Sequence, residues 1–152
     1  MNELFRYLSL FLLIIFNQIF LAIGAWSYLP DIFLIQTLVL TTFIKKLPSV
    51  YFFILKGFIL DLFFSNYSFP YTASYTVIGL YLNLSTLKWI QRSLLEQLMI
   101  IISITLFLNG LLFYLNDFAV GLSIRIILNP LLNCVVWIII FFNQRQKWLK
   151  NI

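Results

Sequence analysis

Three ionisable residues, Lys56, Asp61 and Arg125, lie inside long apolar runs of the sequence. A charge at such a position is costly in a membrane helix, so it marks either a functional site or a structural pair. At 1.5 Å rise per residue, Asp61 and Arg125 lie about 7 and 10 Å from the same end of their predicted helices. We therefore expect an Asp61–Arg125 pair, or a shared water-mediated network. We favour a structural ion pair over a proton or ligand site.

Lys56 and Gly57 precede Asp61 on the same predicted helix. Side chains on a helix tilt toward its N-terminus, so Lys56 leans toward the nearer end and is expected to extend its ammonium group to the membrane surface. Gly57 is four residues before Asp61 and shares its face, where a glycine lets a neighbouring helix approach closely.

Stripes of small and polar residues with helical spacing mark three further segments. They are Thr72, Thr76, Gly79, Asn83 and Thr86 in the first, Thr105 and Asn109 in the second, and Arg125, Asn129 and Asn133 in the third. Such stripes are typical of helix–helix interfaces, so we expect them to face one another across the interior of a bundle. The alternative is a pocket for a small molecule.

Catalytic and metal-binding patterns are missing from the sequence. It has no His, and its one cysteine, Cys134, lies in an apolar run where a small packing residue is expected. There is no carboxylate dyad, no nucleophile–base pairing and no glycine-rich phosphate loop. We therefore expect a protein that is not an enzyme, with no catalytic residues, no metal ligands and no cofactor.

The composition is that of a membrane protein. Hydrophobic residues make up 62% of the 152 residues and charged residues 10%, and the mean hydropathy is +1.01. A soluble domain of this length would be near half apolar and a quarter charged. The net charge of +5 is expected to set orientation in the membrane, and no basic cluster is dense enough to indicate nucleic-acid binding.

Six apolar segments predict an all-α bundle of six transmembrane helices in one domain, residues 1–152. The expected helices cover residues 4–24, 30–44, 48–65, 71–87, 94–115 and 118–142, with turns at 66–70 and 116–117. The first is expected to be retained rather than cleaved as a signal peptide. The second is short for a full crossing and could be tilted or re-entrant. Pro130 is expected to kink the last helix unless neighbours satisfy the freed carbonyl.

Basic residues gather at alternate ends of these segments. They are Arg6, Lys45, Lys46, Lys88, Arg92, Arg145, Lys147 and Lys150, whereas the other ends carry Asp31 and Asp117 and no Lys or Arg. This asymmetry predicts a multi-pass protein of the plasma membrane with both termini in the cytoplasm. Glu96 is four residues after Arg92, and we expect the two to pair.

Several motifs occur in the order found in the MreD family of rod shape-determining proteins. The sequence resembles that family in residues 29–34 (Leu-Pro-Asp-Ile-Phe-Leu), in Pro48, and in residues 57–63 (Gly-Phe-Ile-Leu-Asp-Leu-Phe). The stripe from Thr72 to Asn83, the pair Asn129-Pro130, Asn133 and the basic tail from Arg145 also fit. The chain departs from the family pattern at Phe53, where a glycine is frequent, and in the turn after Asp61.

The resemblance implies a non-enzymatic scaffold in the bacterial machinery for cell-wall elongation. It implies MreC as a partner and, through MreC, an association with MreB, RodA and the elongation-specific penicillin-binding protein. It also implies a fold similar to the substrate-binding subunits of energy-coupling-factor transporters. A transport subunit that binds a vitamin or a lipid is therefore the rival hypothesis.

Overall fold

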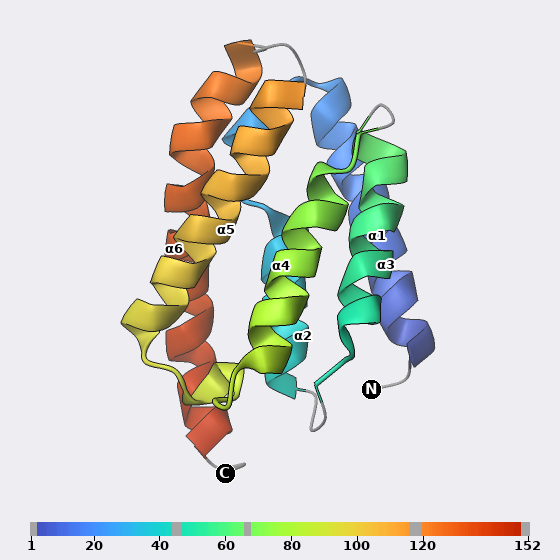
Figure 1. The fold of residues 1–152 in the computed structure, drawn as a ribbon. Helices are drawn as coiled ribbons and strands as arrows, with labels where there is room; N and C mark the ends of the chain where they lie inside the picture. Colours follow the sequence, from blue (N-terminus) through green and yellow to red (C-terminus); the bar gives the residue numbers. More distant parts are fainter. Residues whose placement is uncertain (1–2, 44–46, 66–67, 116–119, 150–152) are drawn as a thin grey trace.

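The computed structural model describes residues 3–43, 47–65, 68–115 and 120–149, without the side chains of residues 3–7, 43, 120–122 and 145–149. Within these ranges its secondary structure is helical throughout, which confirms the all-α part of the predicted class (Figure 1). The elements are α1 (Glu3–Ala22), η1 (Trp26–Tyr28), α2 (Ile32–Phe43), α3 (Val50–Phe64), α4 (Pro70–Leu84), η2 (Trp89–Gln91), α5 (Leu94–Leu115) and α6 (Val120–Leu149).

The predicted segments match these helices to within a few residues, except that α6 continues to Leu149 and runs through Pro130. Two stretches, Leu94–Leu115 and Ser123–Gln144, are long and apolar enough to cross a membrane, which indicates membrane association. Residues 66–67 of the turn predicted at 66–70, the turn predicted at 116–117, and Lys45, Lys46 and Lys150 lie outside the described residues, and Pro70 is the first residue of α4.

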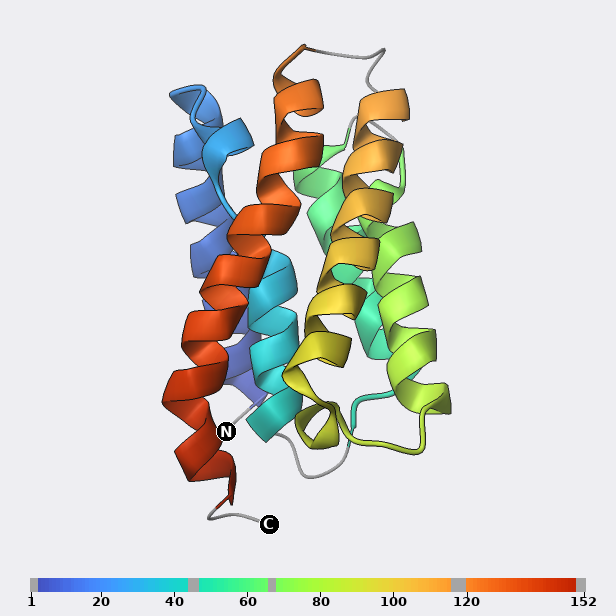
Figure 2. The ribbon, with the colours of Figure 1, turned by 90° about the vertical axis from the view of Figure 1, so that its left-hand side faces the viewer.

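Two antiparallel hairpins, α3/α4 and α5/α6, stand side by side, and α1 lies along the outside (Figures 1 and 2). The start of α1 and the end of α6 lie at the same end of the bundle. Gly24, with a φ of 72°, ends α1 and turns the chain back into the bundle. From there the chain forms η1 and then runs inward as an extended segment, and α2 begins only about halfway along the bundle (Figure 2).

The α3/α4 hairpin is tight because glycines lie at its contact points. A Cβ on Gly57 would lie 2.7 Å from both Thr72 Cα and the Tyr71 carbonyl oxygen. A Cβ on Gly79 would lie 2.9 Å from Phe53 Cβ. The expectation that Gly57 permits a close helix approach is therefore confirmed, and the approaching helix is α4.

At the end of the bundle that holds η2, a buried hydrogen-bonded glutamine lies between two tryptophan residues. Gln97, which is fully buried, accepts a hydrogen bond from Trp137 Nε1 at 2.7 Å and donates one to the Trp89 carbonyl at 2.9 Å. The Trp89 and Trp137 rings meet edge to face at 5.7 Å. These contacts fix the 3₁₀ turn against α5 and α6.

The predicted Arg92–Glu96 pair is wrong. Glu96 accepts from the Ser93 N–H at 3.0 Å, and Ser93 Oγ accepts from the Glu96 N–H at 3.3 Å, so the two form a capping box at the start of α5. Arg92 donates to Ser85 Oγ and lies 4.8 Å from the centroid of the Tyr81 ring.

Candidate functional site

A row of polar side chains on α6 holds the stretch that precedes α2, which consists of η1 and the extended residues after it. Arg125 Nη1 donates to the Trp26 carbonyl at 2.6 Å, and Asn129 Nδ2 donates to the Leu29 carbonyl at 2.6 Å. Asn133 Oδ1 accepts from the Asp31 N–H at 2.6 Å. All three side chains are buried. Backbone groups outside a helix need partners when they are buried, and these residues supply them.

The spacing of this row matches the backbone that it holds. Four residues of α6 advance by about 6 Å, and two extended residues advance by about 6.6 Å. Asn129 and Asn133, four apart, therefore reach Leu29 and Asp31, two apart, with one side chain for each backbone group. The stripe predicted from the sequence is thus an interface, and one of its partners is a segment of backbone rather than a helix.

Behind this row, α5 supplies a second layer. Asn109 accepts from Arg125 Nε at 3.1 Å and donates to Asn129 Oδ1 at 3.1 Å. Thr105 Oγ1 accepts from Asn133 Nδ2 at 3.0 Å. The predicted meeting of the α5 and α6 stripes is therefore confirmed. The Arg125 guanidinium also stacks 3.8 Å from the centroid of the Trp26 ring, which holds η1 against α6.

Asp31 lies in the interior, although the sequence placed it at an end of the bundle. It is 2% exposed, and the partner of its N–H, Asn133, also contacts Thr105 near the midpoint of α5. Asp31 Oδ1 accepts from the Leu34 N–H at 3.0 Å and so caps α2. An acidic residue just before an apolar helix is a recognisable cap. The short apolar run of this segment agrees with a helix that begins inside the bundle.

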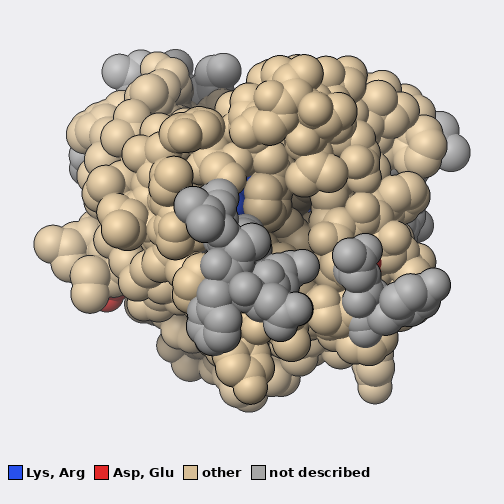
Figure 3. All heavy atoms as spheres, turned by 90° about the horizontal axis from the view of Figure 1, so that it is seen from above, with Lys and Arg blue, Asp and Glu red and all other residues tan. Residues whose placement is uncertain are grey.

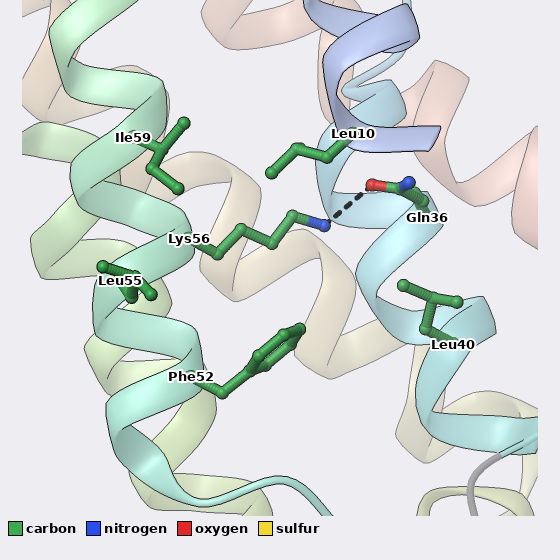
Figure 4. Close-up of a pocket in the computed structure, with 7 residues that line it drawn as sticks. All are labelled: Leu10, Gln36, Leu40, Phe52, Leu55, Lys56 and Ile59. Carbon is green, nitrogen blue, oxygen red and sulfur yellow. Dashed lines mark hydrogen bonds between the residues drawn. The ribbon is translucent and has the colours of Figure 1, made fainter. Parts of the chain in front are cut away.

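Lys56 does not extend toward an end of the bundle as expected. It is 4% exposed and reaches across to α2, where Nζ donates to Thr37 Oγ1 at 2.6 Å and Gln36 Oε1 at 2.8 Å (Figure 4). The Phe33 carbonyl accepts a longer bond of 3.4 Å. Gln36 in turn donates to Ser9 on α1 at 2.9 Å. Lys56 thus links α3 to α2, and through α2 to α1.

A pocket lies where these three helices diverge. Figure 4 shows Leu10 of α1, Gln36 and Leu40 of α2, and residues of α3 around it. The α3 residues in its lining are Phe52, Leu55, Lys56 and Ile59. The walls are apolar, and the polar groups at the Lys56–Gln36 contact are already bonded to each other.

The predicted direct Asp61–Arg125 pair is wrong. Asp61, 3% exposed, accepts from the N–H of Tyr71 at 2.9 Å and the N–H of Thr72 at 2.7 Å. Its carboxylate also accepts from Thr72 Oγ1 at 2.6 Å and Ser65 Oγ at 3.0 Å. These N–H groups belong to the first turn of α4, whose unpaired donors and helix dipole favour a negative charge. Asp61 is therefore a cap for the next helix.

The α4 stripe faces α3, and not the α5 and α6 stripes as predicted. Thr76 Oγ1 donates to the Thr72 carbonyl of its own helix at 2.7 Å. The Asn83 side chain, at an exposed position, donates to the Gly79 carbonyl at 2.8 Å and the Pro48 carbonyl at 3.2 Å. The face of α4 that enters the interior instead carries Tyr71, Ser74, Tyr75, Ile78 and Leu82.

Among the described side chains, the interior therefore contains two cations, Lys56 and Arg125, and two carboxylates, Asp31 and Asp61. Each cation is held by neutral acceptors, and each carboxylate caps a helix. The described residues contain no cluster of His, Cys, Asp or Glu that could hold a metal ion. The arrangement is suited to fixing broken helical elements in place. The roles of Trp26, Gln36 and Thr37 were not predicted, because these residues lie among ordinary apolar or neutral residues in the sequence.

Comparison with protein-family models, with curated proteins and with solved structures finds no match to this chain.

Proposed function

We propose that this protein is a non-enzymatic membrane scaffold of the bacterial cell-elongation machinery, which binds MreC and so supports peptidoglycan synthesis and cell shape. The observation that carries the proposal is the Gly57–Asp61 element. These residues are the centre of the motif that resembles the MreD family. Here Gly57 lets α3 pack closely on α4, and Asp61 accepts hydrogen bonds from the first turn of α4. A fixed pair of helices is what a docking surface for a partner requires.

The proposal includes six membrane crossings with the basic ends in the cytoplasm. Helix α2 has 12 residues and so spans about 18 Å, short of the ~30 Å hydrocarbon core. The three extended residues before it add about 10 Å. Together they cover a crossing of about 28 Å. Non-helical backbone is tolerated at such depth where protein covers it, and the α6 row provides that cover.

The interior supports a structural role over a catalytic one. Its strongest polar contacts go to backbone groups of this chain: Arg125 and Asn129 bind carbonyls, while Asp61 binds N–H groups. Residues used in this way stabilise the bundle and are not available to a substrate. Recognition of MreC would then take place on an outer face of the helices.

Copurification tests this proposal. The tagged protein is expressed in a rod-shaped bacterium, extracted in mild detergent, and its bound proteins and lipids are identified by mass spectrometry. Enrichment of MreC, RodA and the elongation-specific penicillin-binding protein is expected, and depletion of the protein should give rounded or lysing cells. Enrichment of ATPase subunits, or of a stoichiometric vitamin, would instead support the transport subunit and overturn the scaffold.

A pair of variants sharpens the test. Gly57→Leu forces α3 and α4 apart, whereas Gly110→Leu alters a site on α5 where nothing lies within 4 Å of an added Cβ. If a rigid α3/α4 pair supports docking, Gly57→Leu should lose MreC while Gly110→Leu keeps it, at equal protein levels in the membrane. Equal recovery of MreC with both variants would contradict the assigned role of the hairpin.

A further inference from the structure

Seven buried side-chain polar atoms have no hydrogen-bond partner among the described residues, and three of them belong to Asp31, just before α2, and to two adjacent residues of α4. These three are Asp31 Oδ2, Ser74 Oγ and the Tyr75 hydroxyl oxygen. The exposed fractions of the three residues are 2%, 0% and 0%. Buried polar atoms are nearly always paired with protein or with ordered water, so these three unpaired atoms require an explanation.

Asp31 and Tyr75 both lie near the Lys56 ammonium group, and Ser74 precedes Tyr75 in the chain. The Tyr75 ring lies 5.8 Å from Lys56 Nζ, and that ammonium group reaches the Phe33 carbonyl, two residues after Asp31. Asp31 is within electrostatic range of Tyr75, and the Thr37 side chain lies near the Tyr75 hydroxyl without meeting the geometry of a hydrogen bond. Ser74 adjoins Tyr75 on the buried face of α4.

The charges around this region restrict what can bind there. Asp31 is within electrostatic range of both Lys56 and Arg125, so a further cation would be repelled by two positive groups. An anion would be repelled by Asp31. Oδ2 needs a donor, whereas the two hydroxyls can donate and accept. A small neutral molecule that both donates and accepts meets these requirements, and water is the smallest.

We infer that the bundle holds bound water at this point, in a chamber bordered by Asp31, Ser74 and Tyr75. A buried water commonly makes about three hydrogen bonds to groups of this kind. A scaffold requires no such chamber, so the inference goes beyond the proposed function and stands without it. It also identifies the place where a small polar solute could enter the fold by displacing water.

The end of the bundle opposite η2 offers an approach. Figure 3 looks onto that end and shows a hollow between tan side chains, with blue at one point deep inside. The hollow therefore leaves part of a described basic side chain visible from this end.

Hydroxyl-radical footprinting with mass spectrometry tests the chamber, because radicals formed from bound water oxidise the side chains beside it. The full-length protein in lipid nanodiscs is irradiated, and oxidation is compared among Tyr75, Phe53 and Trp137, which are all 0% exposed. Oxidation of Tyr75 above that of Trp137 is expected, although indole is the more reactive ring. Phe53 packs against Gly79 of α4, so it reports any general opening of the hairpin.

Two variants complete the design. Ser74→Ala removes one predicted water ligand and should reduce oxidation of Tyr75, while Ser103→Ala, at an exposed position on α5, should leave it unchanged. Asp31→Asn keeps the shape of the side chain and should also reduce it. Oxidation of Tyr75 no greater than that of Trp137 in the unaltered protein would overturn the inference. Equal oxidation of Tyr75 and Phe53 would overturn it too, because it would indicate opening and not a local chamber.

Discussion

Removal of the Asp61 carboxylate should destabilise the bundle more than any change to an exposed helix cap. The carboxylate accepts four hydrogen bonds, two of them from the N–H groups of Tyr71 and Thr72. In Asp61→Ala the hydroxyls of Ser65 and Thr72 can rotate toward other acceptors, but the two N–H groups are fixed by the helix. Each buried donor left unpaired costs about 1–3 kcal/mol, so we expect a loss of about 4 kcal/mol in the free energy of unfolding.

Asp61→Asn separates the cap from the charge. The amide oxygen can still accept from one N–H group, while the amide nitrogen faces the other donor. We therefore expect a loss of about 2 kcal/mol, roughly half that of Asp61→Ala. The assay is reversible unfolding in mixed micelles, followed by tryptophan fluorescence, with thermal stability in nanodiscs as a second measurement.

Glu96→Ala is the matched control, since Glu96 also caps a helix but at an exposed position. Loss of an exposed cap typically costs about 1 kcal/mol, because water replaces the carboxylate. If Asp61→Ala lost no more stability than Glu96→Ala, the assignment of Asp61 as the buried cap of α4 would be refuted. A charge-reversed Asp61→Arg, Arg125→Asp double variant should give no rescue, because the two residues have separate partners.

Three further changes should each lower stability in the same assay. Gly57→Ala places a Cβ against the backbone of α4 and should cost about 1–3 kcal/mol, whereas Gly110→Ala should be neutral or slightly stabilising. Arg125→Lys loses the planar stack on η1 and cannot keep both hydrogen bonds, so we expect a loss of about 2 kcal/mol; full stability would contradict that role. Trp137→Phe leaves the buried Gln97 oxygen unpaired and should cost about 1–3 kcal/mol, with no loss if that bond is unimportant.

The helices were predictable because the composition of each segment shows whether it is apolar or polar, and an apolar run of this length favours a helix. Long apolar runs broken by Pro, Asn and charged residues located α1 and α3 to α5 to within a few residues at either end. The glycine at position 57 was also interpretable, since only close packing explains a glycine in the middle of an apolar helix. These are local signals, and they depend on no knowledge of how the helices are arranged.

The partners of the charged residues were not predictable in the same way. Equal depth suggested that Asp61 and Arg125 pair, but depth along the bundle gives no information about position around it. Asp61 accepts hydrogen bonds from the start of α4, the next helix in the chain. The two are joined by a short turn. Arg125 donates a hydrogen bond to the carbonyl of Trp26, which is 99 residues away in the chain. A helix start competes well for a carboxylate because its donors are fixed and unpaired.

Both interior carboxylates follow this rule, and it changes how a buried acid in a membrane protein is interpreted. Asp31 caps the helix that it precedes, and Asp61 caps the helix after its own. The difference between them lies in the second oxygen: Oδ2 of Asp61 has two donors, whereas Oδ2 of Asp31 has none among the described residues. Asp61 is therefore a completed structural contact. Asp31 has binding capacity left over, and if either of the two carries a function beyond holding the bundle together, the geometry selects Asp31.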